Sequence, residues 1–185
     1  MVNIKVLFVC TANVNRSPMG AGLLAEHLGA QATDVQIRSA GFTSEDEAAA
    51  EHAIATLSRR GIDISSHRSR LVTPPLLEAQ DLILVMAREH LQATAVTAPH
   101  VFRRTFTIKE FIRRGLKLGP RRTEESVDAW FARIEAARDS SDLLGKPEFD
   151  DVEDPVGEGL ERFERTAQEL DLLTRGVAYL LFQSA

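Results

Sequence analysis

Cysteine is nearly absent from this 185-residue chain, in which Cys10 is the only one. A single thiol excludes an internal disulfide and a zinc site built from several cysteines. Long apolar runs are also missing, so no segment reaches the length of about 20 residues that a transmembrane helix needs. The first residues lack the basic start and the cleavage site of a signal peptide. We therefore expect a cytoplasmic protein with no membrane span.

Positive charge is in the minority, and the formal net charge of −5 argues against a general nucleic-acid binder. The two signs are unevenly spread along the chain. Residues 100–122 contain eight Lys and Arg and one Glu, whereas residues 123–171 contain sixteen Asp and Glu and five Lys and Arg. The basic stretch could steer an acidic partner toward the protein, or it could form a solvated helix face.

The segment VLFVCTANVNRSPMG contains the single cysteine. Residues 4–9 are apolar and rich in β-branched side chains, which predicts a buried strand of a parallel sheet. Ser17 and Pro18 favour the start of a helix, as its cap and its first-turn residue. Cys10 therefore begins a loop, residues 10–17, that joins the carboxyl end of a strand to a helix.

This loop has the features of an anion site. Ligands of α/β proteins bind at the carboxyl edge of the parallel sheet, where a helix N-terminus directs free N–H groups at an anion. The same environment favours the thiolate form of Cys10, which is the nucleophilic form. Arg16 adds a planar guanidinium that can hold two phosphoryl oxygens at once. The spacing C-x5-R alone is a weak signal, and a small buried thiol without chemistry is the alternative.

The rest of the chain alternates short apolar runs with helical patterns, which predicts right-handed βαβ units. With 44% apolar residues, the chain fits one domain over residues 1–185. We expect an α/β fold of three layers, with a central, mostly parallel four-stranded sheet, helices on both faces and the phosphate loop after the first strand. The expected strands are residues 4–9, 35–37, 81–86 and 104–107; the expected helices are residues 18–28, 45–60, 88–95, 109–114, 123–138 and 160–182; and residues 140–159 are expected to form a loop.

A thiolate that attacks a phosphoryl group needs a general acid, because the departing oxygen leaves poorly unless it is protonated. The segment EFDDVEDPVGEG contains the candidate, Asp154, whose backbone Pro155 holds extended. Asp150, Asp151 and Glu153 are close in sequence, and we expect their like charge to crowd Asp154. A calcium loop is excluded because the alternating ligand spacing is missing, and an acidic surface turn without chemistry is the alternative.

The motifs CTANVNRSPMG, RSAGF, GIDISSHRSR, DLILVM, FTIKEF and DVEDPVG occur in the order found in low-molecular-weight protein tyrosine phosphatases. The chain resembles the bacterial type of this family over nearly its whole length. The resemblance implies that Cys10 is the nucleophile, Arg16 the phosphate clamp, and Asp154 the general acid and later the general base. It implies a phosphate-binding loop made of Thr11, Ala12, Asn13, Val14, Asn15, Arg16 and Ser17.

The same resemblance implies supporting roles for four polar residues, and it implies no metal and no cofactor. Ser17 would steady the thiolate, while Asn13, Ser39 and His67 would brace the loop by hydrogen bonds. From the residues alone, Asn13 and Ser39 also suit turns, and His67 suits a cap or a core position.

The chain differs from the family at several positions. The loop position before the arginine is often a second cysteine but is Asn15 here, and Val156 stands where the eukaryotic branch places tyrosines. The helical segment at residues 113–146 is longer than compact family members need. These differences bear on the substrate more than on the class of reaction.

The resemblance implies hydrolysis of protein phosphotyrosine, with a phosphoprotein partner such as a tyrosine kinase or its target. Phosphoarginine hydrolysis is the nearest alternative, although Val14 replaces the threonine of that branch. Arsenate reduction is a further alternative only if an external small thiol supplies the electrons, because passing electrons through the protein's own cysteines needs a second cysteine. The sequence leaves the oligomeric state open.

Overall fold

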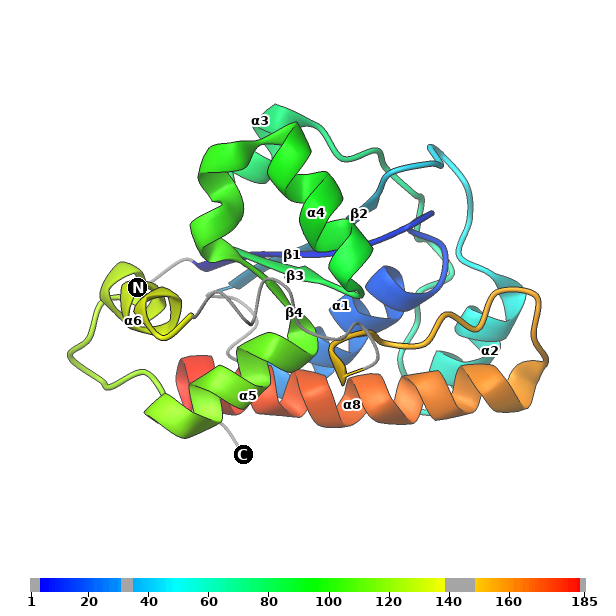
Figure 1. The fold of residues 1–185 in the computed structure, drawn as a ribbon. Coiled ribbons are helices and arrows are strands. Elements are labelled where there is room, and N and C mark those ends of the chain that lie inside the picture. Colours follow the sequence, from blue (N-terminus) through cyan, green and yellow to red (C-terminus); the bar gives the residue numbers. More distant parts are fainter. Residues whose placement is uncertain (1–3, 31–34, 139–148, 184–185) are drawn as a thin grey trace.

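The fold is built on a small parallel sheet. The computed structural model describes residues 4–30, 35–138 and 149–183. The strands all pair in parallel, in the order β2-β1-β3-β4 (Figure 1). The four strands are β1 (Ile4–Cys10), β2 (Val35–Gly41), β3 (Leu82–Val85) and β4 (Thr105–Thr107).

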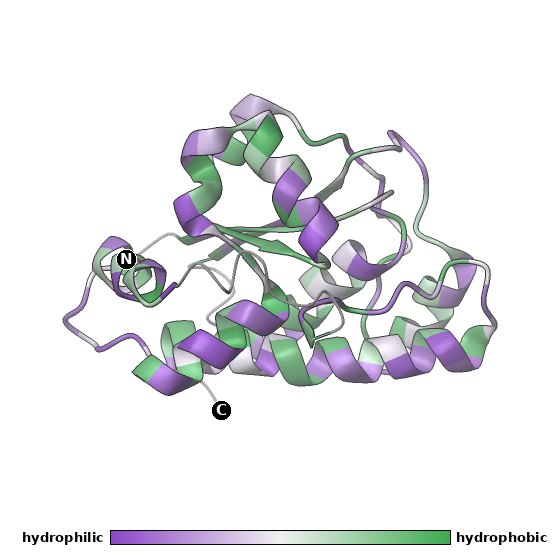
Figure 2. Ribbon diagram, viewed as in Figure 1, coloured by the Kyte–Doolittle hydropathy of each residue, from purple (hydrophilic) through white to green (hydrophobic). Residues whose placement is uncertain are grey.

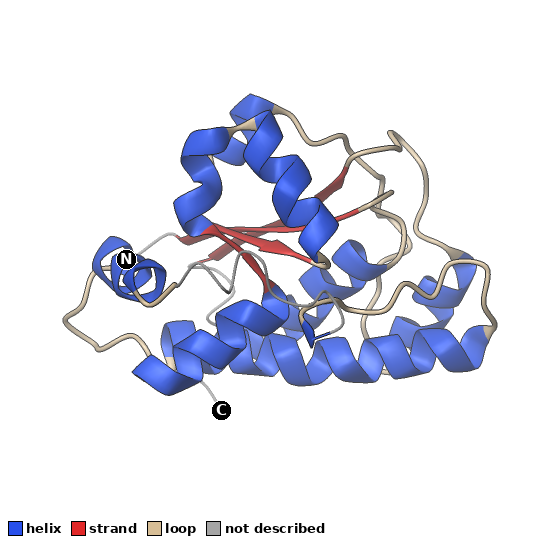
Figure 3. Ribbon diagram, in the orientation of Figure 1, coloured by secondary structure: helices blue, strands red, loops and turns tan. Residues whose placement is uncertain are grey.

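Helices cover both faces of this sheet (Figure 3). Successive side chains of β1 point to opposite faces, so Val6 and Phe8 enter one apolar core while Leu7 and Val9 enter the other. The first core lies against α1, α2, α5, α6 and α8, and the second lies against α3, α4 and η2. The three-layer α/β fold expected from the sequence is confirmed. The helices are α1 (Arg16–Leu28), α2 (Glu51–Ser58), α3 (Pro74–Glu78), α4 (Arg88–Thr97), η2 (Pro99–Arg104), α5 (Ile108–Leu118), α6 (Val127–Ala136) and α8 (Leu160–Phe182).

Helix α8 has the bounds that the sequence predicts. Its buried stripe includes Phe163, Ala167, Leu170, Val177 and Leu181, at the three- to four-residue spacing of one helix face. Figure 2 shows apolar and polar residues alternating along the helix. The apolar stripe packs against α1, α2 and α5, so the last helix closes the first core. No helix within the described ranges is long and apolar enough to cross a membrane.

The helix expected over residues 45–60 begins only at Glu51, because the preceding segment pairs with another loop. Asp46 N–H donates to Ser69 C=O at 2.9 Å, and Ser69 N–H donates to Glu47 C=O at 2.8 Å. Asp46 also has a positive φ of 60°, which is incompatible with a helix. Helical periodicity in this segment was therefore overridden by backbone pairing to a distant part of the chain.

Other elements differ from the prediction mainly at their ends. β2 continues through Gly41, four residues past the strand expected at residues 35–37. The capping side chains of Thr107 and Ser126 accept hydrogen bonds from the third residues after them, which sets the starts of α5 and α6. The short helix α3, capped by Thr73, was not anticipated. Of the long segment at 113–146, residues 113–138 form the end of α5 and α6 with their connections, and residues 139–148 lie outside the described residues.

Candidate active site

The phosphate loop, residues 10–17, runs from the carboxyl end of β1 into α1. The prediction that Ser17 caps this helix is wrong, because α1 begins at Arg16 with Asn15 at the cap position. The turn of the loop depends on Asn13, which is fully buried and has a left-handed φ of 58°. The Asn13 side-chain amide donates to Ser17 Oγ at 2.8 Å, and its carbonyl oxygen accepts from Arg70 N–H at 3.0 Å. The Asn13 side chain therefore fastens both the inside of the loop and the segment beside it.

The Cys10 sulfur lies within a cluster of hydrogen-bonding groups. Ser17 Oγ lies 3.0 Å from Cys10 Sγ, and Asn13 N–H donates to the sulfur at 3.3 Å. Ser17 Oγ also reaches Ala40 C=O, but at 3.4 Å. Because the hydroxyl has one proton, the shorter contact favours donation to the sulfur. The arrangement suits a thiolate, which needs donors around it.

Arg16 is buried at the start of α1 and connects the loop to distant parts of the chain. Its Nη1 donates to Val152 C=O at 3.0 Å, and its Nη2 donates to Thr11 Oγ1 at 3.2 Å and forms an ion pair with Asp154. The buried Arg16 Nε has no hydrogen-bond partner in the described part of the chain. An unsatisfied buried donor is costly, so this guanidinium has spare capacity for an anionic ligand.

Asp154 reaches the loop from the other end of the chain. The acid loop, residues 149–159, precedes α8 and places the Asp154 Oδ2 against Arg16. Asp154 Oδ1 accepts from Val156 N–H at 3.2 Å, which fixes the carboxylate in a local turn. The side chain is 32% exposed, so it is open to solvent and to a ligand.

The expectation that like charge crowds Asp154 is wrong, because the neighbouring carboxylates point elsewhere. Asp150 pairs with Arg88 and Arg113, and Glu153 pairs with Arg162. The Asp151 side chain accepts from the backbone N–H of Arg88 at 2.8 Å. Each carboxylate thus has its own donor, and tertiary contacts separate groups that are adjacent in sequence.

The candidate catalytic residues share one cavity of about 110 Å³. Of the four acidic residues between positions 150 and 154, Asp154 alone lines it. Val14 and Val156 supply apolar surface to the cavity. Its lining residues are Cys10, Thr11, Ala12, Val14, Asn15, Arg16, Asp154 and Val156.

Of two residues predicted to brace the loop, His67 forms a hydrogen bond to it and the Ser39 side chain forms none in the described part of the chain. His67 Nε2 lies 2.7 Å from Asn13 C=O, and because a carbonyl only accepts, the Nε2 atom carries the hydrogen. Burial lowers the pKa of His67, helped by Arg70 and Arg68, while the bond to Asn13 opposes this shift. Ser39 is buried in β2, but no hydrogen bond of its side chain to the loop occurs among the described residues. From β2, the carbonyl oxygen of the next residue, Ala40, lies 3.4 Å from Ser17 Oγ.

The sequence analysis missed His90, which lies in the first turn of α4. His90 Nε2 is 2.9 Å from Thr11 Oγ1, the hydroxyl that also accepts from Arg16. Burial, and then the nearby charge of Arg16, lower the pKa of His90 to about 4. A neutral His90 can accept a hydrogen bond from the Thr11 hydroxyl. The lone pairs of Thr11 Oγ1 then remain available to accept the hydrogen bond from Arg16. The available signal was its place just after β3, at the carboxyl edge that also contains Cys10.

Gly41 is a second missed residue, and it allows β2 to lie against the phosphate loop. A Cβ atom at this position would lie 2.7 Å from both Asn13 N and Thr11 O, which is closer than van der Waals contact permits. The tight approach lets Phe42 N–H donate to Thr11 C=O at 2.6 Å. The sequence signal was a glycine at the end of a strand beside the loop.

The model of the low molecular weight phosphotyrosine protein phosphatase family matches residues 5–120, and the chain belongs to this family. It is therefore a cysteine-based phosphatase, with the fold and the class of chemistry that the sequence predicts. In the described part of the chain, no group of three or more His, Cys, Asp or Glu side chains could hold a metal ion.

Relatives within the family differ in their substrates. A protein-arginine-phosphatase of Bacillus subtilis is 34% identical over 110 residues, which are 59% of this chain and 73% of that protein. A probable low molecular weight protein-tyrosine-phosphatase of Ralstonia nicotianae is 34% identical, over 71% of this chain and 96% of that protein. An arsenate reductase of Bacillus licheniformis is 27% identical, over 88% of this chain and 96% of that protein. Similarity alone therefore does not select the substrate.

The fold agrees with a solved member of the family. The crystal structure of the low molecular weight protein tyrosine phosphatase from T. tengcongensis is 31% identical and superposes with a TM-score of 0.73. The match covers 96% of this chain and 99% of that one. The four-stranded parallel sheet and its helices are thus those of the family.

We expect His90 to make the protein less stable in mild acid. Because its pKa is lowered from 6.5 to about 4, the unfolded chain takes up the proton more readily than the native state. Its contribution to the free energy of unfolding is therefore present above pH 6.5 and lost as the pH falls toward 4. Between pH 7.5 and 5.5 this loss is about 1 kcal/mol. Urea unfolding at both pH values should show a smaller decrease for His90→Gln than for the wild type, and equal decreases would contradict the prediction.

Proposed function

We propose that this phosphatase hydrolyses protein phosphotyrosine through a covalent Cys10 phosphoenzyme, with Asp154 as general acid and then general base. The observation that carries the proposal is the shared cavity, in which Cys10, Arg16 and Asp154 meet although 138 residues separate the last two. The proposed partner is a phosphoprotein, such as a tyrosine kinase or its target, in the cytoplasm.

In the first step, Cys10 Sγ attacks the phosphorus in line with the phenolic oxygen. The sulfur–phosphorus bond forms as the phosphorus–oxygen bond breaks, and Asp154 gives its proton to the departing oxygen. The Arg16 guanidinium and the loop N–H groups stabilise the charge on the transferring phosphoryl group. The contact between Asp154 and Arg16 supports this geometry, because it places the carboxyl beside the group that holds the phosphoryl oxygens.

In the second step, Asp154 accepts a proton from a water molecule that attacks the phosphorus. The sulfur–phosphorus bond breaks, inorganic phosphate forms and Cys10 leaves as the thiolate. The donors around the sulfur, Ser17 Oγ and Asn13 N–H, support this step because they stabilise the leaving thiolate.

The choice of phosphotyrosine rests on the apolar residues of the cavity. Val14 and Val156 offer apolar contact to an aromatic ring and no hydroxyl for a guanidinium. Phosphoarginine hydrolysis is the second candidate, favoured by the arginine phosphatase among the relatives. Arsenate reduction would need an external small thiol, because Cys10 is the only cysteine of the chain.

The deciding experiment compares peptides that contain phosphotyrosine, phosphoarginine and phosphoserine, with arsenate reduction in the presence of a small thiol assayed in parallel. We expect the highest kcat/KM for the phosphotyrosine peptide, measured as phosphate release. A higher kcat/KM for the phosphoarginine peptide would overturn the tyrosine assignment and leave the class of reaction intact. The Cys10→Ser variant measures background release.

Loss of the nucleophile should separate turnover from binding. We expect Cys10→Ser to reduce turnover of an aryl phosphate well below about a tenth of the wild-type value, because the hydroxyl is a far weaker nucleophile. Vanadate binding, measured by calorimetry, should persist since Arg16 and the loop backbone remain. Turnover above that level would contradict the covalent mechanism.

Loss of the general acid should depend on the leaving group. We expect Asp154→Ala to reduce kcat/KM most for aryl phosphates with basic leaving groups and least for activated ones, within the range of about 100- to 10,000-fold typical of general acids. The measurement is kcat/KM across a series of substituted phenyl phosphates, because this ratio reports the step in which the leaving group departs, whereas kcat can report hydrolysis of the phosphoenzyme that all substrates share. Glu153→Ala is the matched control, because Glu153 is the adjacent carboxylate but pairs with Arg162 outside the cavity. An equal loss across the series would assign Asp154 a structural role.

A further inference from the structure

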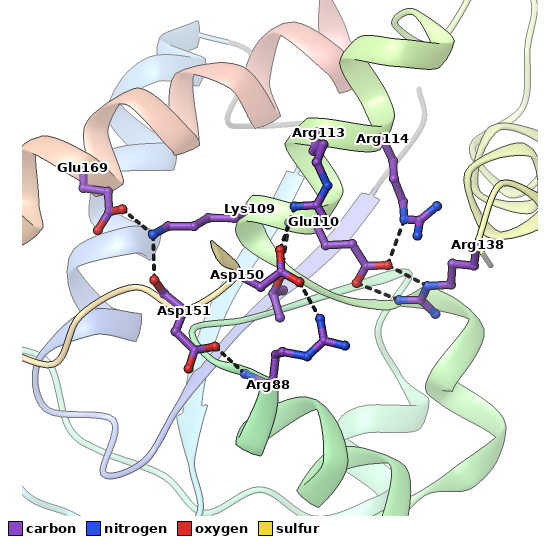
Figure 4. A network of polar contacts seen from close by, with 10 residues as sticks. Arg88, Lys109, Glu110, Arg113, Arg114, Arg138, Asp150, Asp151 and Glu169 are labelled. Carbon is purple, nitrogen blue, oxygen red and sulfur yellow. Dashed lines mark hydrogen bonds and ion pairs between the residues drawn. The ribbon is translucent and has the colours of Figure 1, made fainter. Parts of the chain in front are cut away.

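The acid loop is held by a buried ionic network that takes no part in the steps above (Figure 4). At its centre, Asp150 lies between two arginines from different helices. Its Oδ2 lies 2.5 Å from Arg88 Nη1 at the start of α4, and its Oδ1 lies 2.6 Å from Arg113 Nη1 on α5. The Asp150 side chain is only 5% exposed. A carboxylate this buried needs its charged partners, so its position is determined by two helices that flank the loop.

The next residue adds two contacts of the same kind. Asp151 Oδ1 accepts from Arg88 N–H at 2.8 Å, which satisfies a free backbone donor in the first turn of α4. The neighbouring cap position of α4 is Ala87, which offers no side-chain oxygen. Asp151 C=O accepts from Lys109 Nζ at 2.6 Å, and Lys109 also pairs with Glu169 on α8. Three helices therefore fix residues 150 and 151.

This anchoring is transmitted toward the cavity through Val152. Its N–H donates to Met86 C=O at 2.8 Å, just after β3, and its C=O accepts from Arg16 Nη1 at 3.0 Å. Val152 is itself 1% exposed. Residues 150–152 are thus held by the Asp150 and Asp151 side chains and by the Asp151 and Val152 backbone groups, whereas the Asp154 side chain, two residues further on, is 32% exposed.

We propose that Asp150 is a positioning residue, which sets the place of the Asp154 carboxyl over the cavity through its ion pairs with Arg88 and Arg113. The inference rests on the proposed function, in which Asp154 protonates the leaving group. Proton transfer requires the carboxyl within hydrogen-bond reach of the departing oxygen, and an error of about 1 Å is enough to impair it. Asp150 does not line the cavity, so it acts only through the loop.

The chain offers a matched control on α5. Glu110 is a second buried carboxylate between two arginines, with Oε1 at 2.9 Å from both Arg114 Nε and Arg138 Nε, and its side chain is 4% exposed. Figure 4 shows that the two clusters meet at α5, which contributes Arg113 to the Asp150 cluster and both Glu110 and Arg114 to the other. Asp150→Asn and Glu110→Gln remove the same charge at similar burial. Both should lower stability, but only the first should affect Asp154.

The test is kcat/KM across the series of substituted phenyl phosphates for Asp150→Asn, Glu110→Gln and Asp154→Ala. For Asp150→Asn we expect kcat/KM to fall about 10-fold for basic leaving groups and little for activated ones, a part of the full general-acid effect. Glu110→Gln should change all substrates by the same factor. Arg113 is half-exposed, so Arg113→Gln should give the same leaving-group dependence as Asp150→Asn but a smaller one. Arg113→Gln replaces Asp150→Asn in the test if Asp150→Asn does not fold.

The outcomes distinguish the two proposals. A leaving-group dependence in Asp154→Ala that is absent from both Asp150→Asn and Arg113→Gln would overturn the positioning role alone. A uniform loss in Asp154→Ala would overturn the general-acid assignment itself. The same dependence in Glu110→Gln as in Asp150→Asn would show a general loss of packing and would also overturn the positioning role.

Discussion

The structure of the site depends on one buried guanidinium. Arg16 lies at the start of α1 with its charge inside the protein, where an unpaired charge would be strongly destabilising. Its partners come from the phosphate loop, through Thr11, and from the acid loop, through Val152 and Asp154. The same group that would clamp a phosphoryl oxygen therefore also holds the two halves of the site together. Because the partner residues lie near opposite ends of the chain, the site forms only in the folded protein.

Arginine is used in the same way elsewhere in the molecule. The basic stretch at residues 100–122 is more than a solvated helix face, because some of its cations are buried or paired with buried carboxylates. Arg113 pairs with Asp150, and Arg114 pairs with Glu110. Arg138 joins the second cluster and also stacks over Phe106, 4.1 Å from the ring centroid. The acidic segment at residues 123–171 thus supplies a tertiary partner to part of the basic stretch, as Asp150 does for Arg113, whereas Arg114 pairs with Glu110 inside the stretch.

Local patterns predicted most of the fold because they report local physics. The buried strands stand out as apolar runs, and the amphipathic stripe of α8 gave its bounds at both ends. The helix expected at residues 45–60 was wrong at its start, since pairing of Glu47 with Ser69 outweighed helical preference. The strand expected at residues 35–37 was too short, because β2 runs beside β1 as far as Gly41, which lies against the phosphate loop. Both differences arose where another segment supplied the hydrogen bonds.

The sequence by itself determined the family, the α/β fold class and the spacing of Cys10 and Arg16, because these depend on neighbours along one strand, one loop and one helix. The tertiary structure decided which role each carboxylate of residues 150–154 has. It placed Asp154 in the cavity and Asp150 between two arginines, although the four carboxylates look alike in sequence. It also brought His90 to Thr11 and left Ser39 without a side-chain hydrogen bond to the loop among the described residues. The physical reason is that burial and partner geometry, which assign each polar group its role, exist only after the distant segments have packed.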